Sequence, residues 1–321
     1  MIQMNIYQII LLLLGVIIIL GFLINISYSN KNFNTIKVAY IPCDHEAALF
    51  VALAQDTYKK NGLNITATTM STGSGVVSAI ASGDIDIGYV GITPALQGIS
   101  EDMPIKIVGS VNLDGSGIVV NPESGINTTT DLKGKKIATP GVSSIQQVLL
   151  LYQLQKYNMT SRDVDISSVN IYMIPSTLAS HKVDAYIAYE PYVSIAPFKN
   201  SGNNMMNSDE IMPGHPCCVI IARQDFIDKH PQELQKFLDI HKNTTKFVNN
   251  NKNVTAQLIS NVITTNPELE KTALSHVIFI SQVDKSFKQK VLDFINIEIE
   301  MQYLKKNITD KEIFDTRFLG D

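Results

Sequence analysis

The sequence lacks tryptophan, has few cysteines and carries little charge. None of its 321 residues is tryptophan and three are cysteine. Three cysteines cannot form the disulfide framework of a small secreted protein. The net charge of −4 gives no reason to expect nucleic-acid binding. Hydrophobic residues make up 45% of the chain and charged residues 17%, which favours a well-buried protein of one large or two ordinary domains.

Charge is also absent from the stretch 6–26, which has the roughly 20 apolar residues needed to cross a bilayer. No lysine or arginine precedes this stretch, and the residues after it make a poor cleavage site for a secretory signal. No cysteine follows closely enough for a lipid anchor. We therefore expect a transmembrane anchor or uncleaved signal at 6–26, followed by a polar tether at 27–35.

The stretch 71–104 predicts two helix starts that point to one place. Small residues open it and lead into a helical pattern that Gly83 ends. A strand pattern follows at 85–90, and Thr93 and Pro94 then fit the cap and the first position of a second helix. Helix N-termini carry free N–H groups that bind anions, so this arrangement favours a small-molecule site.

The same stretch resembles the first-lobe signature of solute-binding proteins of nitrate, sulfonate and taurine ABC importers. That group shares its fold with the pyrimidine-precursor synthase of thiamine biosynthesis. The matching first-lobe runs are Ser-Gly-Asp-Ile-Asp-Ile-Gly at 82–88, Gly-x-x-Pro-Ala-Leu at 91–96 and Met-Pro-Ile-Lys-Ile-Val at 103–108. Further along the chain, Asp-Leu-Lys-Gly-Lys-Lys-Ile-Ala at 131–138 and Val-Asp-Ala at 183–185 with Glu-Pro at 190–191 resemble the second-lobe motifs of the same family. Tyr189 stands where the family usually has tryptophan, and Lys182 where it usually has glycine.

The local patterns agree with the α/β fold that this resemblance implies. Strand, helix, glycine and strand follow one another from 36 to 65 as a βαβ unit, and Asp44 fits the cap of a helix predicted over 47–61. A strand is predicted over 169–174. Ser144 precedes a long helix with capping-box spacing, and a buried strand over 215–222 returns the chain to the first lobe.

We expect a two-lobed clamshell of the periplasmic-binding-protein type II class, in which each lobe is a mixed sheet flanked by helices and an N-terminal transmembrane helix precedes both. The expected bounds are 36–113 with 216–321 for lobe 1 and 114–215 for lobe 2. Ligands of open α/β sheets bind at strand C-termini, which places Asp44, His45, Ser74 and Thr93 at one edge of the first sheet. The resemblance implies a ligand site between the two lobes. The candidate ligand-binding residues are Asp44, His45, Ser74, Gly75, Thr93, Ser143, Ser144, Tyr189, Glu190 and His215.

The resemblance implies a binding protein that holds a small anionic solute and delivers it to an ABC permease and its ATPase. We expect it to be a monomer at the cell membrane, with the binding domain outside, no cofactor and no nucleic-acid partner. No Ser/His/Asp spacing matches a catalytic motif, so an enzyme is not expected. One alternative is an enzyme similar to the thiamine-pyrimidine synthase, whose family carries a cysteine-rich cluster.

A membrane-tethered metal-binding protein is the other alternative. Cys43 and His45 could converge with His215 and Cys217 at the cleft, and cysteine and histidine are ligands of zinc and copper(I). The spacing matches no standard zinc pattern. Adjacent cysteines on a regular strand point to opposite faces, so we expect only one of Cys217 and Cys218 to be able to bind a metal.

Overall fold

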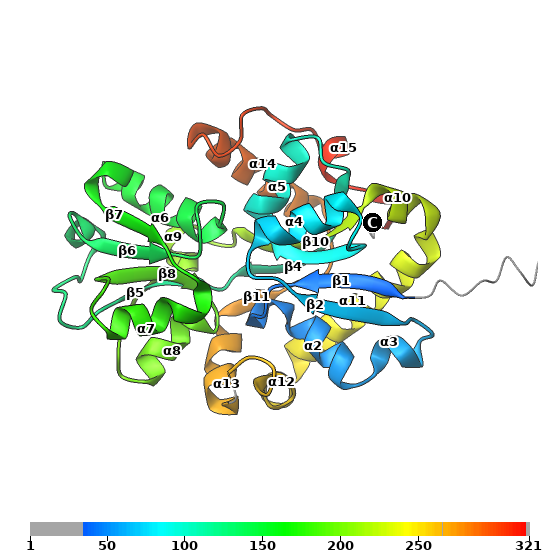
Figure 1. Ribbon diagram of the computed structural model, residues 1–321, viewed down its shortest axis with the longest axis horizontal. Coiled ribbons are helices and arrows are strands. Elements are labelled where there is room, and N and C mark those ends of the chain that lie inside the picture. The colour runs from blue at the N-terminus through cyan, green and yellow to red at the C-terminus, as the bar shows by residue number, and fades with distance from the viewer. Residues whose placement is uncertain (1–34, 265, 319–321) are drawn as a thin grey trace, which may run out of the picture.

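The computed structural model describes residues 35–264 and 266–318. The predicted anchor at 6–26 and all but the last residue of the tether lie outside this part of the chain. Within the described ranges, no helix combines the length and apolar character that a membrane span requires. The chain forms two separate β-sheets, each with helices on both faces (Figure 1).

The first sheet has six strands and is mixed, as predicted. In spatial order they are β11 (Val277–Phe279), β4 (Ile105–Asp114), β10 (Pro216–Arg223), β3 (Ile87–Gly91), β1 (Ile36–Tyr40) and β2 (Ile65–Thr69). The strands β1, β2 and β3 are parallel, and β10 runs antiparallel between β3 and β4. The strand predicted to return the chain to the first lobe is therefore confirmed.

The second sheet has five strands in the order β7 (Asp165–Ser168), β6 (Lys136–Thr139), β8 (Ala185–Tyr189), β5 (Ser116–Val120) and β9 (Asn203–Asn207). The strand β6 pairs in parallel with β7 and β8, whereas β5 is antiparallel to β8 and β9. Every residue of β5 and β8 is buried, as expected for strands covered on both faces.

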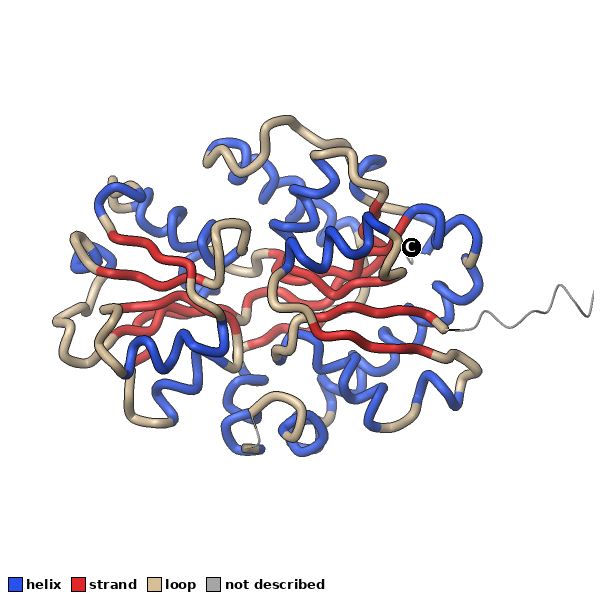
Figure 2. Tube along the Cα trace, in the orientation of Figure 1, coloured by secondary structure: helices blue, strands red, loops and turns tan. Residues whose placement is uncertain are grey.

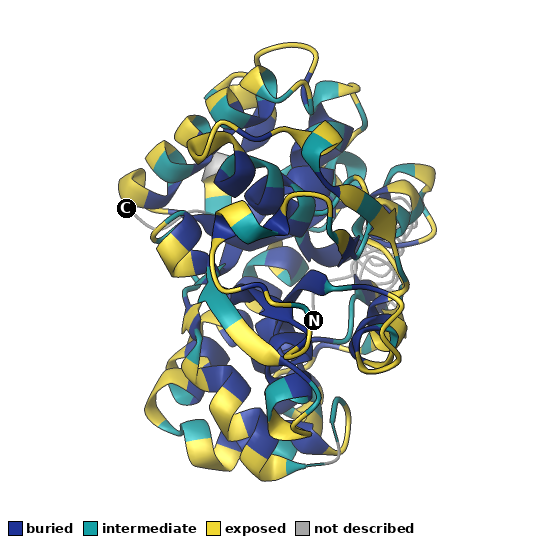
Figure 3. Cartoon of the chain, turned by 90° about the vertical axis from the view of Figure 1, so that its left-hand side faces the viewer, coloured by how far each residue is buried: buried dark blue, intermediate teal, exposed yellow. Residues whose placement is uncertain are grey.

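Helices cover both faces of each sheet, and Figure 2 shows the strands enclosed between them. The first lobe, defined as the first sheet with its helices, contains η1 (Asp44–Glu46), α2 (Ala47–Ala54), α3 (Thr57–Lys60), α4 (Gly73–Ser82), α5 (Ile92–Ser100), α10 (Gln224–Lys229), α11 (Pro231–Asn250), α12 (Lys252–Ser260), α13 (Pro267–Ser275), α14 (Lys285–Glu300), α15 (Asp310–Ile313) and η5 (Thr316–Phe318). The second lobe contains η2 (Thr129–Leu132), α6 (Ile145–Lys156), η3 (Ser161–Asp163), η4 (Ile171–Met173), α7 (Ile174–Ala179), α8 (Tyr192–Phe198) and α9 (Ser208–Ile211). Figure 3 shows the buried residues inside this helical cover.

Two predicted elements are wrong. The helix expected over 47–61 is broken at Asp56, whose backbone is left-handed, so two helices, α2 and α3, replace it. Most of α2 is buried because α11 and α12 pack on it. The segment 169–174 is no strand, because β7 ends at Ser168 and the Asn170 side chain accepts a hydrogen bond from the Tyr172 N–H, which starts η4.

The chain crosses between the lobes at two adjacent places. The first crossing joins β4 to β5 through Gly115, and the second enters β10 after His215. The N–H of Asp114 donates to the carbonyl of His215 at 3.2 Å, and the Nε2 atom of His215 lies 3.7 Å from Oδ1 of Asp114. Both side chains are buried, so these contacts hold the two crossings side by side.

Candidate functional site

A cleft of about 330 Å³ lies between the two lobes. Its first-lobe wall consists of Ile41, Cys43, His45, Glu46, Ser71, Thr72, Gly73, Ser74, Gly91, Pro94 and Cys218. Its second-lobe wall consists of Pro140, Gly141, Val142, Ser143, Ser144, Ile145, Gln146, Ser168 and Tyr189. Five predicted candidates therefore line the cleft, namely His45, Ser74, Ser143, Ser144 and Tyr189.

The N-terminus of α4 forms part of the first wall. Thr72 is its N-cap, and the Oγ1 atom accepts a hydrogen bond from the Gly75 N–H at 3.1 Å. The helix thus begins at Gly73, inside the predicted small-residue loop at 71–75, and Ser74 lies in its first turn. A Cβ at Gly73 would come within 2.6 Å of Pro94 Cγ, so only glycine lets α4 and α5 approach this closely. Gly83 ends the helix with a φ of +92°, as predicted.

The N-terminus of α6 forms the matching part of the second wall. Ser144 is its N-cap, as the spacing predicts, and the Oγ atom accepts a hydrogen bond from the Gln147 N–H at 3.3 Å. The same hydroxyl donates to the carbonyl of Gly141 at 2.7 Å. Gln146 is buried, and its amide donates to the Ser116 hydroxyl at 3.0 Å. Two capped helix N-termini, one from each lobe, therefore open onto one cleft.

Tyr189 and His45 stand close together in the cleft. Their ring centroids lie 5.9 Å apart, and Tyr192 packs edge-on against Tyr189 at 5.6 Å. Burial raises the pKa of Tyr189 well above its usual range, so the phenol remains protonated. Tyr189 therefore provides a neutral aromatic surface in the second-lobe wall of the cleft.

His45 is almost fully buried between two cysteines and a backbone carbonyl. Its Nδ1 atom lies 3.3 Å from Cys218 Sγ and 3.6 Å from Cys217 Sγ, and its Nε2 atom lies 3.0 Å from the carbonyl oxygen of Gly115. Burial alone lowers the pKa of His45, but the charge and hydrogen bond of Cys217, together with Glu46 and the Gly115 carbonyl, outweigh burial and raise the pKa to about 9. The hydrogen bond from Cys218 is the main reason that the pKa of Cys217 is low.

Both cysteine sulfurs face the same histidine, so the prediction that only one of them could bind a metal is wrong. The Sγ atoms of Cys217 and Cys218 lie 4.0 Å apart. The pairing of β10 with β4 shifts register on either side of Cys218, and this irregularity ends the strict alternation of side chains. Cys43, in contrast, donates to a carboxylate oxygen of Glu46 at 2.6 Å.

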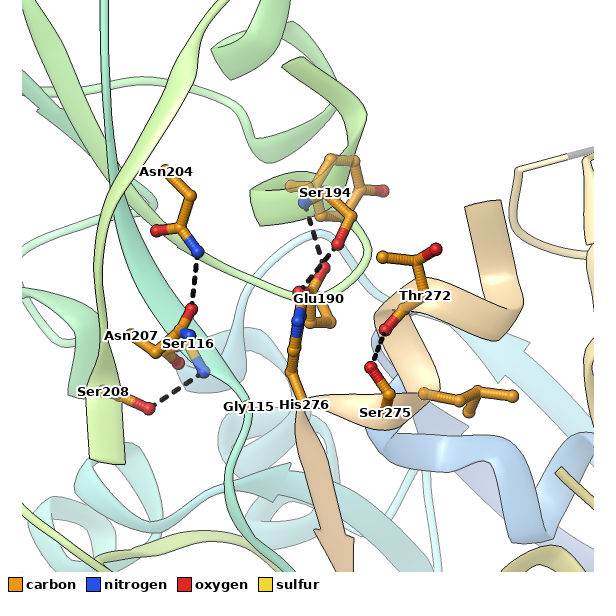
Figure 4. Close-up of polar contacts among 12 residues, drawn as sticks. Gly115, Ser116, Glu190, Ser194, Asn204, Asn207, Ser208, Thr272, Ser275 and His276 are labelled. Atoms are coloured by element: carbon orange, nitrogen blue, oxygen red, sulfur yellow. Dashed lines mark hydrogen bonds and ion pairs between the residues drawn. The ribbon is translucent and has the colours of Figure 1, made fainter. Parts of the chain in front are cut away.

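Asp44 and Glu190 lie behind the cleft and do not line it. Asp44 does not cap a helix, since its carboxylate is buried beside Glu270. Burial, followed by the charge of Glu270, raises the pKa of Asp44 well above its usual range. Glu190 accepts hydrogen bonds from the N–H and the hydroxyl of Ser194, and Figure 4 shows it between Ser194 and His276. A carboxylate oxygen of Glu190 lies 2.5 Å from His276 Nδ1.

The three remaining predicted residues, Thr93, Gly75 and His215, do not line the cleft either. Thr93 is not a cap, because α5 begins at Ile92 and its N-cap is Gly91. The hydroxyl of Thr93 is buried and lies beside the carboxyl of Glu298. Gly75 donates its N–H to the cap of α4 but does not line the cleft. His215 belongs to the crossing segments described above.

The cleft also contains residues that sequence reasoning missed. Thr72, Glu46 and Gln146 line it. The position of Thr72 before a helical pattern is a cap signal that was available, whereas burial of Gln146 depends on its contact with a distant strand. None of the described residues that line the cleft is lysine or arginine. Burial raises the pKa of Glu46, its one carboxyl-bearing residue, to about 7. An anion here would therefore meet N–H groups, hydroxyls and His45.

A sequence model of the NMT1-like family matches residues 29–263, well over half of the chain. The chain belongs to the NMT1-like family. Among curated relatives, it is 25% identical over 278 residues to a putative aliphatic sulfonates-binding protein of Bacillus subtilis, covering 83% of this chain and 80% of the relative. It is 27% identical over 190 residues to the taurine-binding periplasmic protein of Escherichia coli, covering 58% of each.

An enzyme also occurs among the relatives. The chain is 27% identical over 220 residues to the 4-amino-5-hydroxymethyl-2-methylpyrimidine phosphate synthase of Aspergillus parasiticus, covering 64% of this chain and 63% of the enzyme. Among solved structures, the alkanesulfonate-binding protein SsuA of Xanthomonas axonopodis bound to MOPS superposes with a TM-score of 0.76 at 17% identity, over 87% of this chain and 98% of that chain. This likeness confirms the two-sheet periplasmic-binding-protein fold.

Proposed function

We propose that this protein is the extracytoplasmic solute-binding component of an ABC importer. Its solute is a small anion of the nitrate, sulfonate or taurine type, held between the two lobes. The observation that carries this proposal is the convergence of α4 and α6, whose capped N-termini enter the same cleft from opposite lobes. Family membership and the binding proteins among the relatives support it.

The size and charge of the cleft favour a small solute with a single negative charge. A volume of about 330 Å³ is at the lower end for small-molecule sites. Each helix N-terminus is equivalent to roughly half a positive charge, so two of them together match one negative charge. A sulfonate or nitrate group can accept hydrogen bonds from several N–H and O–H groups at once, which suits walls without lysine or arginine.

We assign the solute contacts to the predicted residues that line the cleft. Ser74 and the first turn of α4 contact the anionic group from one side, and Ser143 and Ser144 contact it from the other. His45 lines the first-lobe wall beside the solute, and the ring of Tyr189 packs against the apolar part of the solute. Closure of the lobes about their two crossings signals to the permease that the solute is bound.

In this proposal, the apolar stretch at 6–26 anchors the protein in the cell membrane. The binding domain lies outside the cell, where it delivers solute to the permease. An enzyme similar to the pyrimidine synthase is the alternative that the Aspergillus parasiticus relative leaves open. The two functions differ in their ligand, because an importer component binds the anion and a synthase-like protein binds an aminopyrimidine. The same binding experiment therefore separates them.

The test is thermal unfolding of the full-length chain with nitrate, bicarbonate, taurine, short alkanesulfonates and an aminopyrimidine. Buffers must contain no sulfonate, which excludes HEPES, MOPS and MES. A solute at 100-fold over its dissociation constant stabilises the fold by about 2.7 kcal/mol, which is readily measured. We expect stabilisation by one of the anions, reduced by Ser144→Ala and unchanged by Ser78→Ala on the exposed face of α4. Stabilisation by the aminopyrimidine alone would contradict the proposal.

A further inference from the structure

His45, Cys217 and Cys218 form a compact cluster in the first-lobe wall. Their Nδ1 and two Sγ atoms lie 3.3, 3.6 and 4.0 Å from one another. The three residues are 1%, 0% and 7% exposed. Across the described ranges, this is the one group of histidine, cysteine and carboxylate residues close enough to share a metal ion.

The contact between His45 and Gly115 orients the ring for metal binding. The carbonyl oxygen of Gly115 can only accept a hydrogen bond, so Nε2 of His45 carries the proton. The Nδ1 atom, on the side of the two sulfurs, then becomes a metal ligand by losing any proton that it carries. Metal-binding histidines usually donate their other N–H in this way, which fixes the ring and its tautomer. A Cβ at Gly115 would lie 2.6 Å from Nε2, so glycine is needed for this contact.

The irregularity in β10 brings the second sulfur into place. On a regular strand, Cys217 and Cys218 would point to opposite faces of the sheet. The register shifts on both sides of Cys218 instead place the two Sγ atoms 4.0 Å apart, each within 3.6 Å of His45 Nδ1. Bulges of this kind occur where a strand must redirect a side chain toward a site.

We propose that His45, Cys217 and Cys218 bind one thiophilic d¹⁰ metal ion, Cu(I) or Zn(II), through Nδ1 and two thiolates. Ligands at about 2.0–2.3 Å from a common ion are roughly 3.5–4 Å apart, close to the spacings observed here. On binding, the thiol protons and any proton on Nδ1 leave to solvent, and the metal keeps its oxidation state.

The number of ligands favours Cu(I). Thiolates select soft ions such as Cu(I) and zinc, but zinc sites in proteins have four ligands and this cluster provides three. Zinc would need a fourth ligand, and the cleft supplies room for one because His45 and Cys218 line it. The ion would therefore lie in the wall of the cleft, beside both crossings between the lobes.

The test is a metal titration of the full-length chain, fully reduced and kept without oxygen. Bicinchoninate competes for Cu(I) and 4-(2-pyridylazo)resorcinol for Zn(II), and neither chelator carries a sulfonate that could occupy the cleft. We expect one equivalent of metal per chain, with Cu(I) bound more tightly. X-ray absorption of the loaded protein should show two sulfur ligands and one nitrogen ligand, a result that needs no variant.

Variants identify the ligands. Cys217→Ser, Cys218→Ser and His45→Gln should each abolish stoichiometric binding, whereas Cys43→Ser should retain it because Cys43 contacts Glu46 instead. Circular dichroism checks that each variant is folded. The proposal is overturned if the reduced wild type, with three free thiols, takes up no metal, or if its bound metal has no sulfur ligands. Solute binding is measured without added metal, so this proposal and the proposed function can fail independently.

Discussion

The first lobe presents α4 to the cleft with Thr72 as its cap, and the second lobe presents α6 with Ser144 as its cap. Beyond this shared geometry the two walls differ. The first wall contains histidine, glutamate and two cysteines, whereas the second contains hydroxyls, backbone groups, Gln146 and Tyr189. The comparison teaches that both lobes contribute a capped helix N-terminus to the cleft, but that the titratable side chains other than Tyr189 belong to the first lobe.

The largest effect should come from moving one wall as a whole. Gly73→Ala places a methyl group 2.6 Å from Pro94 Cγ and 3.3 Å from Val90 Cγ2, so the start of α4 must shift away from α5. We expect solute affinity to fall at least about tenfold, equivalent to about 1.4 kcal/mol. Calorimetric titration measures it, with Ser78→Ala as the control on the same helix. Unchanged affinity in a folded Gly73→Ala variant would show that the first wall does not contact the solute.

Matched cap removals compare the two walls directly. Thr72→Ala and Ser144→Ala should each reduce the free energy of unfolding by about 1 kcal/mol, the usual contribution of an N-cap. Each should also weaken solute binding, and their stability effects should add to within about 0.5 kcal/mol because the caps lie in different lobes. Urea unfolding and calorimetry provide both quantities. Loss of affinity in only one variant would indicate a one-sided site.

The contact between the lobes at Glu190 and His276 should depend on pH. The hydrogen bond to Glu190 is the main cause that raises the pKa of His276 above its ordinary value of 6.5. The charged form of His276 is therefore favoured in the folded protein. Its contribution to the free energy of unfolding is complete below pH 6.5 and is lost as the pH rises through the raised pKa. Melting temperatures should separate wild type from His276→Gln most clearly at low pH.

Ser275→Ala, on the neighbouring exposed position of α13, is the matched control for this pH profile. It should shift the melting temperature equally at each pH, if at all. A constant difference between wild type and His276→Gln from pH 5 to 9 would mean that the Glu190 contact does not titrate.

The smallest effect should come from the hydroxyl of Tyr189. Its ring packs against His45 and Tyr192, and we assign its role to that surface. Tyr189→Phe keeps the ring and should change the free energy of solute binding by less than about 1 kcal/mol, the net contribution of one hydrogen bond. Tyr189→Ala should weaken binding more. If the two variants lose equal affinity in a calorimetric titration, the hydroxyl is the contact that matters.

Local signals predicted one helix cap correctly and another wrongly. The cap of α6 follows from Ser144 and Gln147, which are three positions apart, and the structure confirms it. The cap at Thr93 was wrong, because the capping preference of a threonine says nothing about its burial beside Glu298, a residue about 200 positions away. Element type was thus more predictable than the exact residue that begins a helix.

Long-range packing decides the features that the sequence did not reveal. The regular alternation of a strand argued against two ligating cysteines, and a register shift in β10 relative to β4 reverses that conclusion. Asp44 has the local pattern of a cap, but its carboxylate lies against Glu270 on α13, which a local pattern cannot show. Such cases depend on which distant elements meet.

The most direct test of the central claim is a crystal structure of the protein with 2-aminoethanesulfonate or a short alkanesulfonate bound. The account predicts that the sulfonate oxygens accept hydrogen bonds from the first turn of α4 and from the first turn of α6, so that both lobes contact one anion. A solute bound to a single lobe, or outside the cleft between Ser74 and Ser144, would contradict it.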